Sequence, residues 1–499
     1  MNAMTNTAVL VVGAGIMGAG IAQVAAQAGH RVMLFDARAG AAAEAKDKLA
    51  SSLQALVAKG KLSAESVAAA LANIDAIATL QEASGAGLVV EAIVEKLDVK
   101  RGLFRDLEAI VSAECVLATN TSSISVTAIA NGLQHPGRLV GMHFFNPVPL
   151  MKLVEVVSGL QTDAAVAQAI FALSERWGKV AVHARSTPGF IVNRIARPFY
   201  AETLALLQEQ AATPQVLDAC MRAVGFRMGP CELMDLIGHD TNFAVTQSVY
   251  EANFFDKRFQ PSLIQREMVD GGLLGRKSGR GFYRYPADAA QTESAAVTPA
   301  SLPDAKTVCV HGSGVFADLL HQALPDAARA PASDWVGLEM DGAQLRLTDG
   351  RCASQLGSNV AVFDLPLQAK GSKAGIAQGP LAFAVSSRAS QEWAAQAAQC
   401  LQALGFVPQR VADTPGLVAA RTIAMLINEG ADAVHQGVCS ETAADAAMKL
   451  GVNYPAGPFE WLGQWGAAPV CAVLDALDAH YRGERYRVSP YLRQQLWKA

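Results

Sequence analysis

Two residues that can exchange a proton stand twelve positions apart near the middle of the first half of the chain. His143 lies between apolar and aromatic neighbours, and Glu155 interrupts the apolar run 153–157. A carboxylate inside such a run is costly unless it has a partner, and a nearby imidazole is the obvious one. A glutamate that orients a histidine and stabilises its cation makes a general base. The alternative is a hydrogen-bonded core histidine, with Glu155 capping a loop.

A glycine-rich turn near the N-terminus has the spacing of a dinucleotide-binding loop. It joins a predicted strand to a predicted helix at 19–28, and the next strand ends at Asp36. Gly13 allows a tight turn, Gly15 lets backbone approach a pyrophosphate, and Gly18 lets the helix pack closely on the strand. The helix N-terminus adds N–H groups for phosphates. Asp36 would bind ribose hydroxyls and repel a 2′-phosphate, which favours NAD over NADP.

Three more predicted strands end at the edge where this turn lies. The segment 87–95 runs into acidic residues, and the strand that begins at Val116 runs into hydroxyl residues around Ser122. The segment 138–143 ends on His143 itself. Ligands of open α/β sheets bind at the carboxyl ends of the strands. This convergence favours the catalytic interpretation of His143.

The second half of the chain repeats the first. Thr187–Arg194, which opens a predicted all-helical segment at 187–285, matches Thr414–Arg421 at an offset of 227 residues. A second pair of matching segments, 221–232 and 448–460, follows at nearly the same offset. Fixed-offset similarity of this kind indicates a duplicated structural unit.

The second copy lacks the chemistry of the first. Ala420 stands where the first copy has Asn193, the apolar run 380–385 has no carboxylate in the place of Glu155, and 307–317 resembles a degenerate nucleotide turn. We therefore interpret the second copy as structural, or as shaping the substrate site.

The predicted fold is an α/β Rossmann domain followed by an all-α domain, then a degenerate α/β segment and a second all-α copy. A chain of 499 residues needs several cores. The predicted parts, with a linker at 286–306 rich in Ala, Pro, Ser and Thr, are 1–186 (NAD-binding), 187–286 (helical), 300–412 (degenerate Rossmann-like) and 413–499 (second helical).

Composition excludes several other classes of protein. The chain is 51% hydrophobic and 17% charged, with a net charge of −4 and no basic block, so we expect no nucleic-acid partner. Its eight cysteines form no CxxC pair, which predicts a reducing cytoplasm and no metal site. We find neither a signal peptide nor an apolar run of 18 residues, and expect no membrane partner.

Together the motifs GAGIMGAGIAQVAA, VVEAIVEKLDVK, NTSSIS, GMHFFNPVPLMKLVEVV, TPGFIVNR and GRKSGRGFYRY strongly resemble the L-3-hydroxyacyl-CoA dehydrogenase family. The resemblance is dense over 8–285. The second helical copy makes the chain similar to the longer, tandem members, among them 3-hydroxybutyryl-CoA-type dehydrogenases and the 3-hydroxyadipyl-CoA dehydrogenases of phenylacetate breakdown.

The resemblance implies a role for each matching residue. His143 matches the catalytic base, Glu155 its orienting partner, Ser122 a substrate contact and Asn193 an active-site amide that holds the substrate. Lys59 matches, more loosely, a basic contact to CoA phosphates. The residues implied to contact the cofactor are Gly13, Gly15, Ile16, Met17, Gly18, Asp36, Glu95, Lys100, Asn146 (also an active-site amide) and Lys277.

The resemblance further implies NAD-dependent oxidation of a 3-hydroxyacyl-CoA, in fatty-acid β-oxidation or phenylacetate catabolism, without a metal. It implies a homodimer, or a pseudo-dimer formed within one chain by the two helical copies. Two other classes stay open. One is a different Rossmann β-hydroxyacid dehydrogenase with a lysine base, and the other is a non-enzymatic NAD-binding or structural protein.

Overall fold

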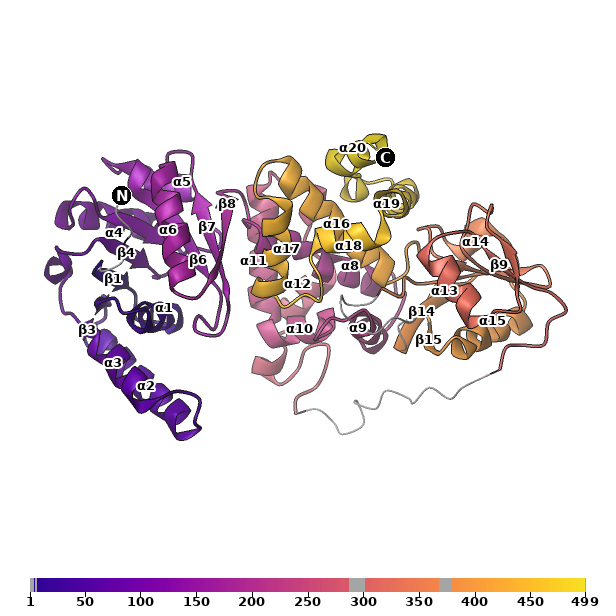
Figure 1. The fold of residues 1–499 in the computed structure, drawn as a ribbon, viewed down its shortest axis with the longest axis horizontal. Helices are drawn as coiled ribbons and strands as arrows, with labels where there is room; N and C mark the ends of the chain where they lie inside the picture. The colour runs from indigo at the N-terminus through magenta and orange to yellow at the C-terminus, as the bar shows by residue number, and fades with distance from the viewer. Residues whose placement is uncertain (1–3, 5–6, 287–300, 368–378, 499) are drawn as a thin grey trace. The chain divides into compact units, whose positions relative to one another are not determined.

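The structure is a computed structural model that describes residues 4, 7–286, 301–367 and 379–498, and Figure 1 shows its ribbon. The chain divides into two compact units. The first contains Met1–Arg194 and Gln436–Val452, and the second contains Ile195–His435 and Asn453–Ala499. Most of the predicted linker at 286–306 lies outside the described residues.

An eight-stranded sheet forms the centre of the first unit, with the strand order β3-β2-β1-β4-β5-β6-β7-β8. The strands from β3 to β6 are parallel, β7 is antiparallel to β6, and β8 is parallel to β7. The strands that the sequence predicted are confirmed. The bounds of all eight strands, the predicted ones and the others, are β1 (Val9–Val12), β2 (Val32–Phe35), β3 (Ile74–Ala76), β4 (Leu88–Glu91), β5 (Val116–Thr119), β6 (Leu139–Phe144), β7 (Leu153–Ser158) and β8 (Val180–Arg185).

Helices flank this sheet, and the predicted helix after the glycine turn begins at Ile16, three residues earlier than expected. Apolar faces of the strands and helices form one buried cluster that spans the sheet. The helices of this unit are α1 (Ile16–Gln27), α2 (Ala41–Ala58), α3 (Ala64–Ala72), α4 (Leu97–Ile110), α5 (Val126–Ala130), α6 (Ala164–Arg176), α7 (Val192–Ile195) and α17 (Glu441–Gly451).

The second unit has a seven-stranded mixed sheet with the order β10-β9-β11-β12-β13-β14-β15. The strands are β9 (Val308–His311), β10 (Ala328–Ala330), β11 (Gly337–Met340), β12 (Ala343–Leu347), β13 (Val360–Phe363), β14 (Gly379–Val385) and β15 (Phe406–Arg410). As the sequence predicted, a glycine turn follows β9 and leads into α13 (Val315–Ala323).

The remaining helices of the second unit come from both copies. The helix α8 of the first copy packs against α16 of the second. The helices are α8 (Arg197–Gln208), α9 (Pro214–Ala223), α10 (Pro230–Ile237), α11 (His239–Ala252), α12 (Leu263–Asp270), α14 (Ala353–Leu356), α15 (Gln391–Ala403), α16 (Ala419–His435), α18 (Pro458–Trp465), α19 (Ala467–Tyr481) and α20 (Pro490–Lys498).

The two copies share a strained turn. Phe190, after Gly189, has a positive φ of 47°, and Leu417, after Gly416, has a φ of 52°. Positive φ is unfavourable for residues with a large side chain and persists only where the surroundings enforce it. Duplication therefore kept the backbone of this turn as well as its Thr-Pro-Gly sequence.

Strand register shows which positions of the two copies correspond. His143 on β6 pairs with Glu155 on β7. In the second copy Ala382 pairs with Gln409 on β15, as Glu155 pairs with Val182 on β8. The backbone N–H of Asp364 donates to the carbonyl of Ala382 at 2.9 Å, so Asp364 stands in the position of His143.

The second copy thus retains a buried carboxylate, that of Asp364, which directly follows β13 and lies opposite β14. Asp364 accepts hydrogen bonds from the backbone N–H groups of Val418, Ala419 and Ala420 at 2.6–3.0 Å. Val418 and Ala419 are the counterparts of Ile191 and Val192 in the first copy. Burial raises the Asp364 pKa to about 6. The expectation that the second copy has no carboxylate in the place of Glu155 is correct for β14, where Ala382 occupies that position. For the site as a whole it is wrong, because Asp364 supplies a carboxylate from the position of His143.

One helix of each copy also packs on the sheet of the other copy. Within the first unit, α17 of the second copy packs on β7 and β8, and within the second unit, α9 of the first copy packs on β14. Because α9 and α17 are equivalent helices, this exchange is reciprocal.

We predict that Asp364→Ala lowers the free energy of unfolding by about 1–3 kcal/mol, because the buried N–H groups of Leu365, Val418, Ala419 and Ala420 lose their acceptor. The exposed Asp326→Ala is the control. The folded-state pKa is raised, so this carboxyl contributes stability that is lost as pH rises through about 6. Urea denaturation should therefore show a larger difference between wild type and variant at about pH 5 than at about pH 8. If the difference in unfolding free energy between wild type and variant were the same at both pH values, this account would be contradicted.

Candidate active site

His143 and Glu155 face each other across neighbouring antiparallel strands. The Nδ1 atom of His143 lies 2.6 Å from Oε2 of Glu155, with Glu155 fully buried and His143 6% exposed. Because a carboxylate only accepts, Nδ1 carries the proton, and this leaves the lone pair of Nε2 available to accept another. The predicted partnership between these two residues is confirmed.

The other oxygen of Glu155 fixes the carboxylate in place. Oε1 accepts hydrogen bonds from the N–H groups of Ile191 and Val192, both at 3.0 Å, at the start of α7. The donors around Glu155 therefore hold it from both sides, and a helix N-terminus favours its negative charge. This contact also joins the strands β6 and β7 to the segment that carries Asn193.

Aromatic rings restrict the orientation of the imidazole. The ring centroid of Phe145 lies 4.5 Å from that of His143, and the ring of Phe190 lies 5.8 Å away in an edge-on arrangement. Phe190 is the residue with the strained positive φ. The strained turn thus places an apolar ring against the candidate base.

The loop that carries Ser122 is organised by Glu95. Oε1 of Glu95 accepts from the Thr121 hydroxyl at 2.6 Å and from the N–H groups of Ser122 and Ser123 at 3.0 and 3.2 Å. Burial tends to raise the Glu95 pKa, but the Lys100 ammonium and these hydrogen bonds outweigh it and lower the pKa. Glu95 is therefore ionised at neutral pH and positions Ser122, whose own side chain is half-exposed.

Lys100 lies beneath this loop. It is 1% exposed, and its Nζ is 2.6 Å from Oε1 of Glu91 and 3.2 Å from Oε2 of Glu95. The other Glu91 oxygen accepts from the Thr119 hydroxyl at 2.6 Å. A direct cofactor contact by Lys100 stays a prediction. In the structure its charge balances two carboxylates at the ends of the central strands.

Asn193 reaches the same loop, as its matching motif implies. Its Nδ2 donates to the backbone carbonyl of Ser122 at 3.3 Å. Asn120, at the end of β5, accepts from the N–H of Phe144 at 2.8 Å and ties that strand end to β6. His143 thus contacts Glu155, Asn193 contacts the Ser122 backbone, and the N–H groups of Ile191 and Val192 link the two pairs within the first unit.

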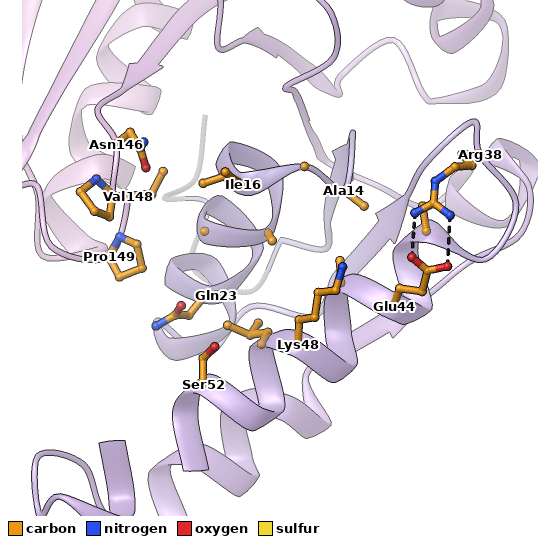
Figure 2. Close-up of a pocket in the computed structure, with 17 residues that line it drawn as sticks. Ala14, Ile16, Gln23, Arg38, Glu44, Lys48, Ser52, Asn146, Val148 and Pro149 are labelled. Atoms are coloured by element: carbon orange, nitrogen blue, oxygen red, sulfur yellow. Dashed lines mark hydrogen bonds and ion pairs between the residues drawn. The ribbon is translucent and has the colours of Figure 1, made fainter. Parts of the chain in front are cut away.

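A cavity of about 410 Å³ lies beside the glycine turn, and Figure 2 shows its lining. Ile16 faces Asn146 and the loop after it across this cavity, and Gly15 also lines the cavity. Gly13 has φ +103°, and a Cβ on Gly18 would lie 1.7 Å from the Gly13 carbonyl oxygen, so both glycines are required by the fold. By contrast, a Cβ on Gly15 would meet nothing within 4 Å. The missing side chain of Gly15 therefore leaves room for a ligand.

The other residues expected at the cofactor lie partly in the first unit and partly in the second. The Asp36 carboxylate accepts from the N–H of Ala14 at 2.8 Å and of Arg38 at 2.9 Å, at the end of β2 beside the glycine turn. Met17 is half-buried on the first turn of α1. Lys277 belongs to the second unit, where its ammonium pairs with Asp240.

Sequence reasoning missed five polar residues that line the cavity, namely Gln23, Arg38, Glu44, Lys48 and Ser52. Lys48 and Ser52 of α2 line it, and both looked like ordinary residues of a solvated helix face. Lys59, the expected CoA contact, is exposed at the C-terminal cap of the same helix. Because Ser52 and Lys59 are seven residues apart, they lie on one face of the helical segment. This seven-residue spacing is the sequence signal that could have identified the face of α2 beside the cavity.

Within the described residues, no group of three or more His, Cys, Asp or Glu side chains is arranged to hold a metal ion. No helix in the described part of the chain is long and apolar enough to cross a membrane.

Family models match nearly the whole chain. The 3-hydroxyacyl-CoA dehydrogenase NAD binding domain matches residues 8–187, and the C-terminal domain of the same family matches 189–285 and 416–498. A 3-hydroxybutyryl-CoA dehydrogenase reduced Rossmann-fold domain matches 345–415.

Individual relatives agree with these matches. A 3-hydroxyadipyl-CoA dehydrogenase of Escherichia coli K12 is 42% identical and covers 98% of this chain and 97% of its own length. The human mitochondrial hydroxyacyl-coenzyme A dehydrogenase is 40% identical over 56% of this chain and 90% of its own. A crystal structure of 3-hydroxybutyryl-CoA dehydrogenase from E. coli K12 has a TM-score of 0.88, with 40% identity, 99% coverage of this chain and 98% of that one.

We predict that Glu155→Gln lowers kcat by about 10²-fold, the range that positioned proton transfer contributes. The three groups that hydrogen-bond to Glu155 all donate, so the amide NH2 of glutamine must face a donor. Steady-state kinetics and NADH binding by fluorescence will test this, with exposed Glu175→Gln as the control. The Kd of NADH should stay within about threefold of the wild-type value. An unchanged kcat would remove Glu155 from the mechanism.

Proposed function

The chain belongs to the 3-hydroxyacyl-CoA dehydrogenase family, and we propose that His143 is the base with which it oxidises an L-3-hydroxyacyl-CoA to the 3-oxoacyl-CoA. The protein is an NAD-dependent oxidoreductase. The observation that carries the assignment of the base is the hydrogen bond of 2.6 Å between Nδ1 of His143 and Glu155, which leaves Nε2 to accept a proton.

The glycine turn and Asp36 would hold NAD, and the bound cofactor would supply the acceptor for the hydride of substrate C3. Nε2 of His143 takes the proton of the 3-hydroxyl group, and Glu155 stabilises the imidazolium that forms. Ser122 and Asn193 hold the substrate oxygens, supported by the Asn193–Ser122 contact of 3.3 Å. In reduction the same histidine returns the proton to the oxyanion at C3.

The cofactor and the CoA portion have separate supports in the first unit. The turn at Gly13, Gly15 and Gly18 offers N–H groups of α1 to a pyrophosphate, and Asp36 stands where a ribose would bind. We assign Lys48, Ser52 and Lys59 of the α2 region to the CoA phosphates and pantetheine, because they supply a cation-bearing face beside the cavity.

For the acyl group we propose 3-hydroxyadipyl-CoA or 3-hydroxybutyryl-CoA, in phenylacetate catabolism or fatty-acid β-oxidation. The names of the full-length relative and of the structural relative support these two substrates. A lysine-base β-hydroxyacid dehydrogenase is not favoured, since the paired groups are an imidazole and a carboxylate. A non-enzymatic NAD-binding protein is not favoured either.

We propose that the two helical copies form a pseudo-dimer within one chain. The packing of α8 against α16 and the ion pair of 2.7 Å between Arg421 and Glu202, both fully buried, support this proposal. Light scattering should then give the mass of one chain, about 52.3 kDa, and a mass of twice that value would favour a homodimer. Eight free cysteines support a reducing, cytoplasmic location.

We predict that His143→Gln lowers turnover by about 10²–10⁴-fold and leaves NAD binding intact, because glutamine cannot take up the hydroxyl proton. The matched control is His135→Gln, an exposed histidine of the same unit. NADH formation from 3-hydroxybutyryl-CoA and 3-hydroxyadipyl-CoA gives kcat, and fluorescence titration gives the Kd of NADH. Full turnover in the His143 variant would overturn the assignment of the base.

A further inference from the structure

One cavity of the first unit gathers positive charge that the mechanism does not use. It has a volume of about 400 Å³ and is lined by the end of α1, the loop before β7 and the turn between α6 and β8, and we name it the Trp177 cavity. No aspartate or glutamate of the described chain lines it. Such a lining favours an anionic ligand. The lining side chains that can donate a hydrogen bond are Gln27, Lys152, Arg176, Trp177 and Lys179.

Lys179 is a buried cation of this cavity. It is 8% exposed, and its ammonium donates to the backbone carbonyls of Val148 and Met151 at 2.5 and 2.8 Å. An ammonium has three N–H donors, so one remains after these two bonds. Burial lowers the pKa of Lys179. An anion in the cavity would offset the cost of this buried charge.

Trp177 provides an independent sign of a ligand. It lines the cavity and is 6% exposed, yet its indole Nε1 is buried without a hydrogen-bond partner in the part of the chain that the structure describes. The ring packs against those of His30 and Phe144, with centroids 5.7 and 6.3 Å away. Buried donors without an acceptor are uncommon in native proteins and call for an explanation. An oxygen atom of a bound anion would accept this hydrogen.

The cations are not needed to cap the helices that end beside the cavity. Basic side chains often bind the last carbonyls of a helix. Here the backbone N–H groups of 177–179 donate to carbonyls of α6, and those of 28–30 donate to carbonyls of α1. Lys152 and Arg176 are exposed and make no ion pair or side-chain hydrogen bond with any described residue. Their charges are therefore available to a ligand.

The internal repeat separates these groups from the needs of the fold. The segment 176–179 matches 403–406 at the offset of 227 residues, in agreement with the strand register. Its glycine has a positive φ in both copies, 74° at Gly178 and 88° at Gly405. The turn thus forms in the second copy without a cation or an indole. The counterparts of Lys152, Arg176, Trp177 and Lys179 are Gly379, Ala403, Leu404 and Phe406.

We propose that the Trp177 cavity binds a phosphate group, supplied by inorganic phosphate or by an organic phosphate ester. A phosphate monoester carries about −1.5 to −2 charges at pH 7, which the cations of this cavity can balance. Charge-assisted hydrogen bonds from lysine and arginine to phosphate are strong. The cavity also has apolar lining from Val24, Met151 and Leu150, the last 76% exposed, against which the organic part of an ester would pack.

The Trp177 cavity is separate from the cavity beside the glycine turn. The two share one lining residue, Pro149, which Figure 2 shows on the far side from the glycine turn. A phosphate group in the Trp177 cavity would therefore not displace NAD. Binding can be measured on the full chain saturated with NADH, which keeps added phosphate away from the glycine turn.

The experiment is a calorimetric titration of this complex with phenyl phosphate. Arg176→Ala and Lys152→Ala should each raise the Kd about 10- to 100-fold, the effect of one lost charged hydrogen bond. Trp177→Phe keeps an aromatic ring and removes the N–H group, and should raise the Kd about three- to tenfold. The matched control is Arg105→Ala, an exposed arginine of α4, which should leave the Kd unchanged.

Two further titrations distinguish the sources of the phosphate group. If the ligand is inorganic phosphate, it should bind within about threefold of phenyl phosphate, and Leu150→Ser should change neither Kd. If the ligand is an ester, phenyl phosphate should bind at least about tenfold more tightly than inorganic phosphate, and Leu150→Ser should reduce that advantage. Benzoate, which carries one charge on the same ring, should bind more weakly than phenyl phosphate.

Three results would overturn the proposal. Phenyl phosphate could fail to bind the NADH complex, or it could bind the wild type and the variants at Lys152 and Arg176 with equal Kd. Benzoate could also bind as tightly as phenyl phosphate, which would exclude selectivity for a phosphate group. The Tm of each variant without ligand shows that the comparison is made between folded proteins.

Discussion

A buried carboxylate surrounded by donors is the constraint on which the first unit depends. Glu155 faces His143 with one oxygen and the first N–H groups of the α7 segment with the other. A buried charge is tolerated only when its hydrogen-bonding capacity is used. Meeting that requirement fixes the imidazole tautomer and the start of the segment that carries Asn193 at the same time. One charge therefore couples the imidazole of His143 to the segment that carries Asn193.

The second copy shows which part of this arrangement belongs to the fold. There the carboxylate of Asp364 occupies the position of the histidine, and Ala382 occupies the position of the glutamate, yet the equivalent N–H groups are still bound. The strained Gly-Phe turn is likewise kept as Gly-Leu. Selection for folding thus accounts for a carboxylate at this junction, but not for the imidazole or for Asn193.

Sequence patterns predicted most of the fold because each pattern reflected a local physical requirement. Apolar runs that end in polar residues gave the parallel strands, and the glycine spacing gave the turn before α1. The pairing of His143 with Glu155 followed from the cost of a carboxylate in an apolar run. The role of Glu95 as the acceptor beneath Ser122 did not follow, because it depends on two loops 27 residues apart in sequence.

Features that depend on contacts between residues distant in the sequence could not be predicted from sequence patterns either. The role of Asp364 depends on strand register in a degenerate sheet, where a single alanine at 382 removed the expected match. The position of α17 in the first unit was equally hidden, because periodicity identifies a helix but not the sheet on which it packs. Lys48 and Ser52 resembled a solvated face until the cavity beside them was visible.

The reciprocal exchange of α9 and α17 explains why the degenerate copy persists. A helix on β7 and β8 covers the strand that carries Glu155, and Gly451 at the end of α17 meets the side chains of Leu153 and Val192 with no room for a Cβ. The second copy therefore supports the catalytic strand pair directly. Packing constrains this copy and preserves its backbone and burial, whereas the position of Asn193 is occupied there by Ala420.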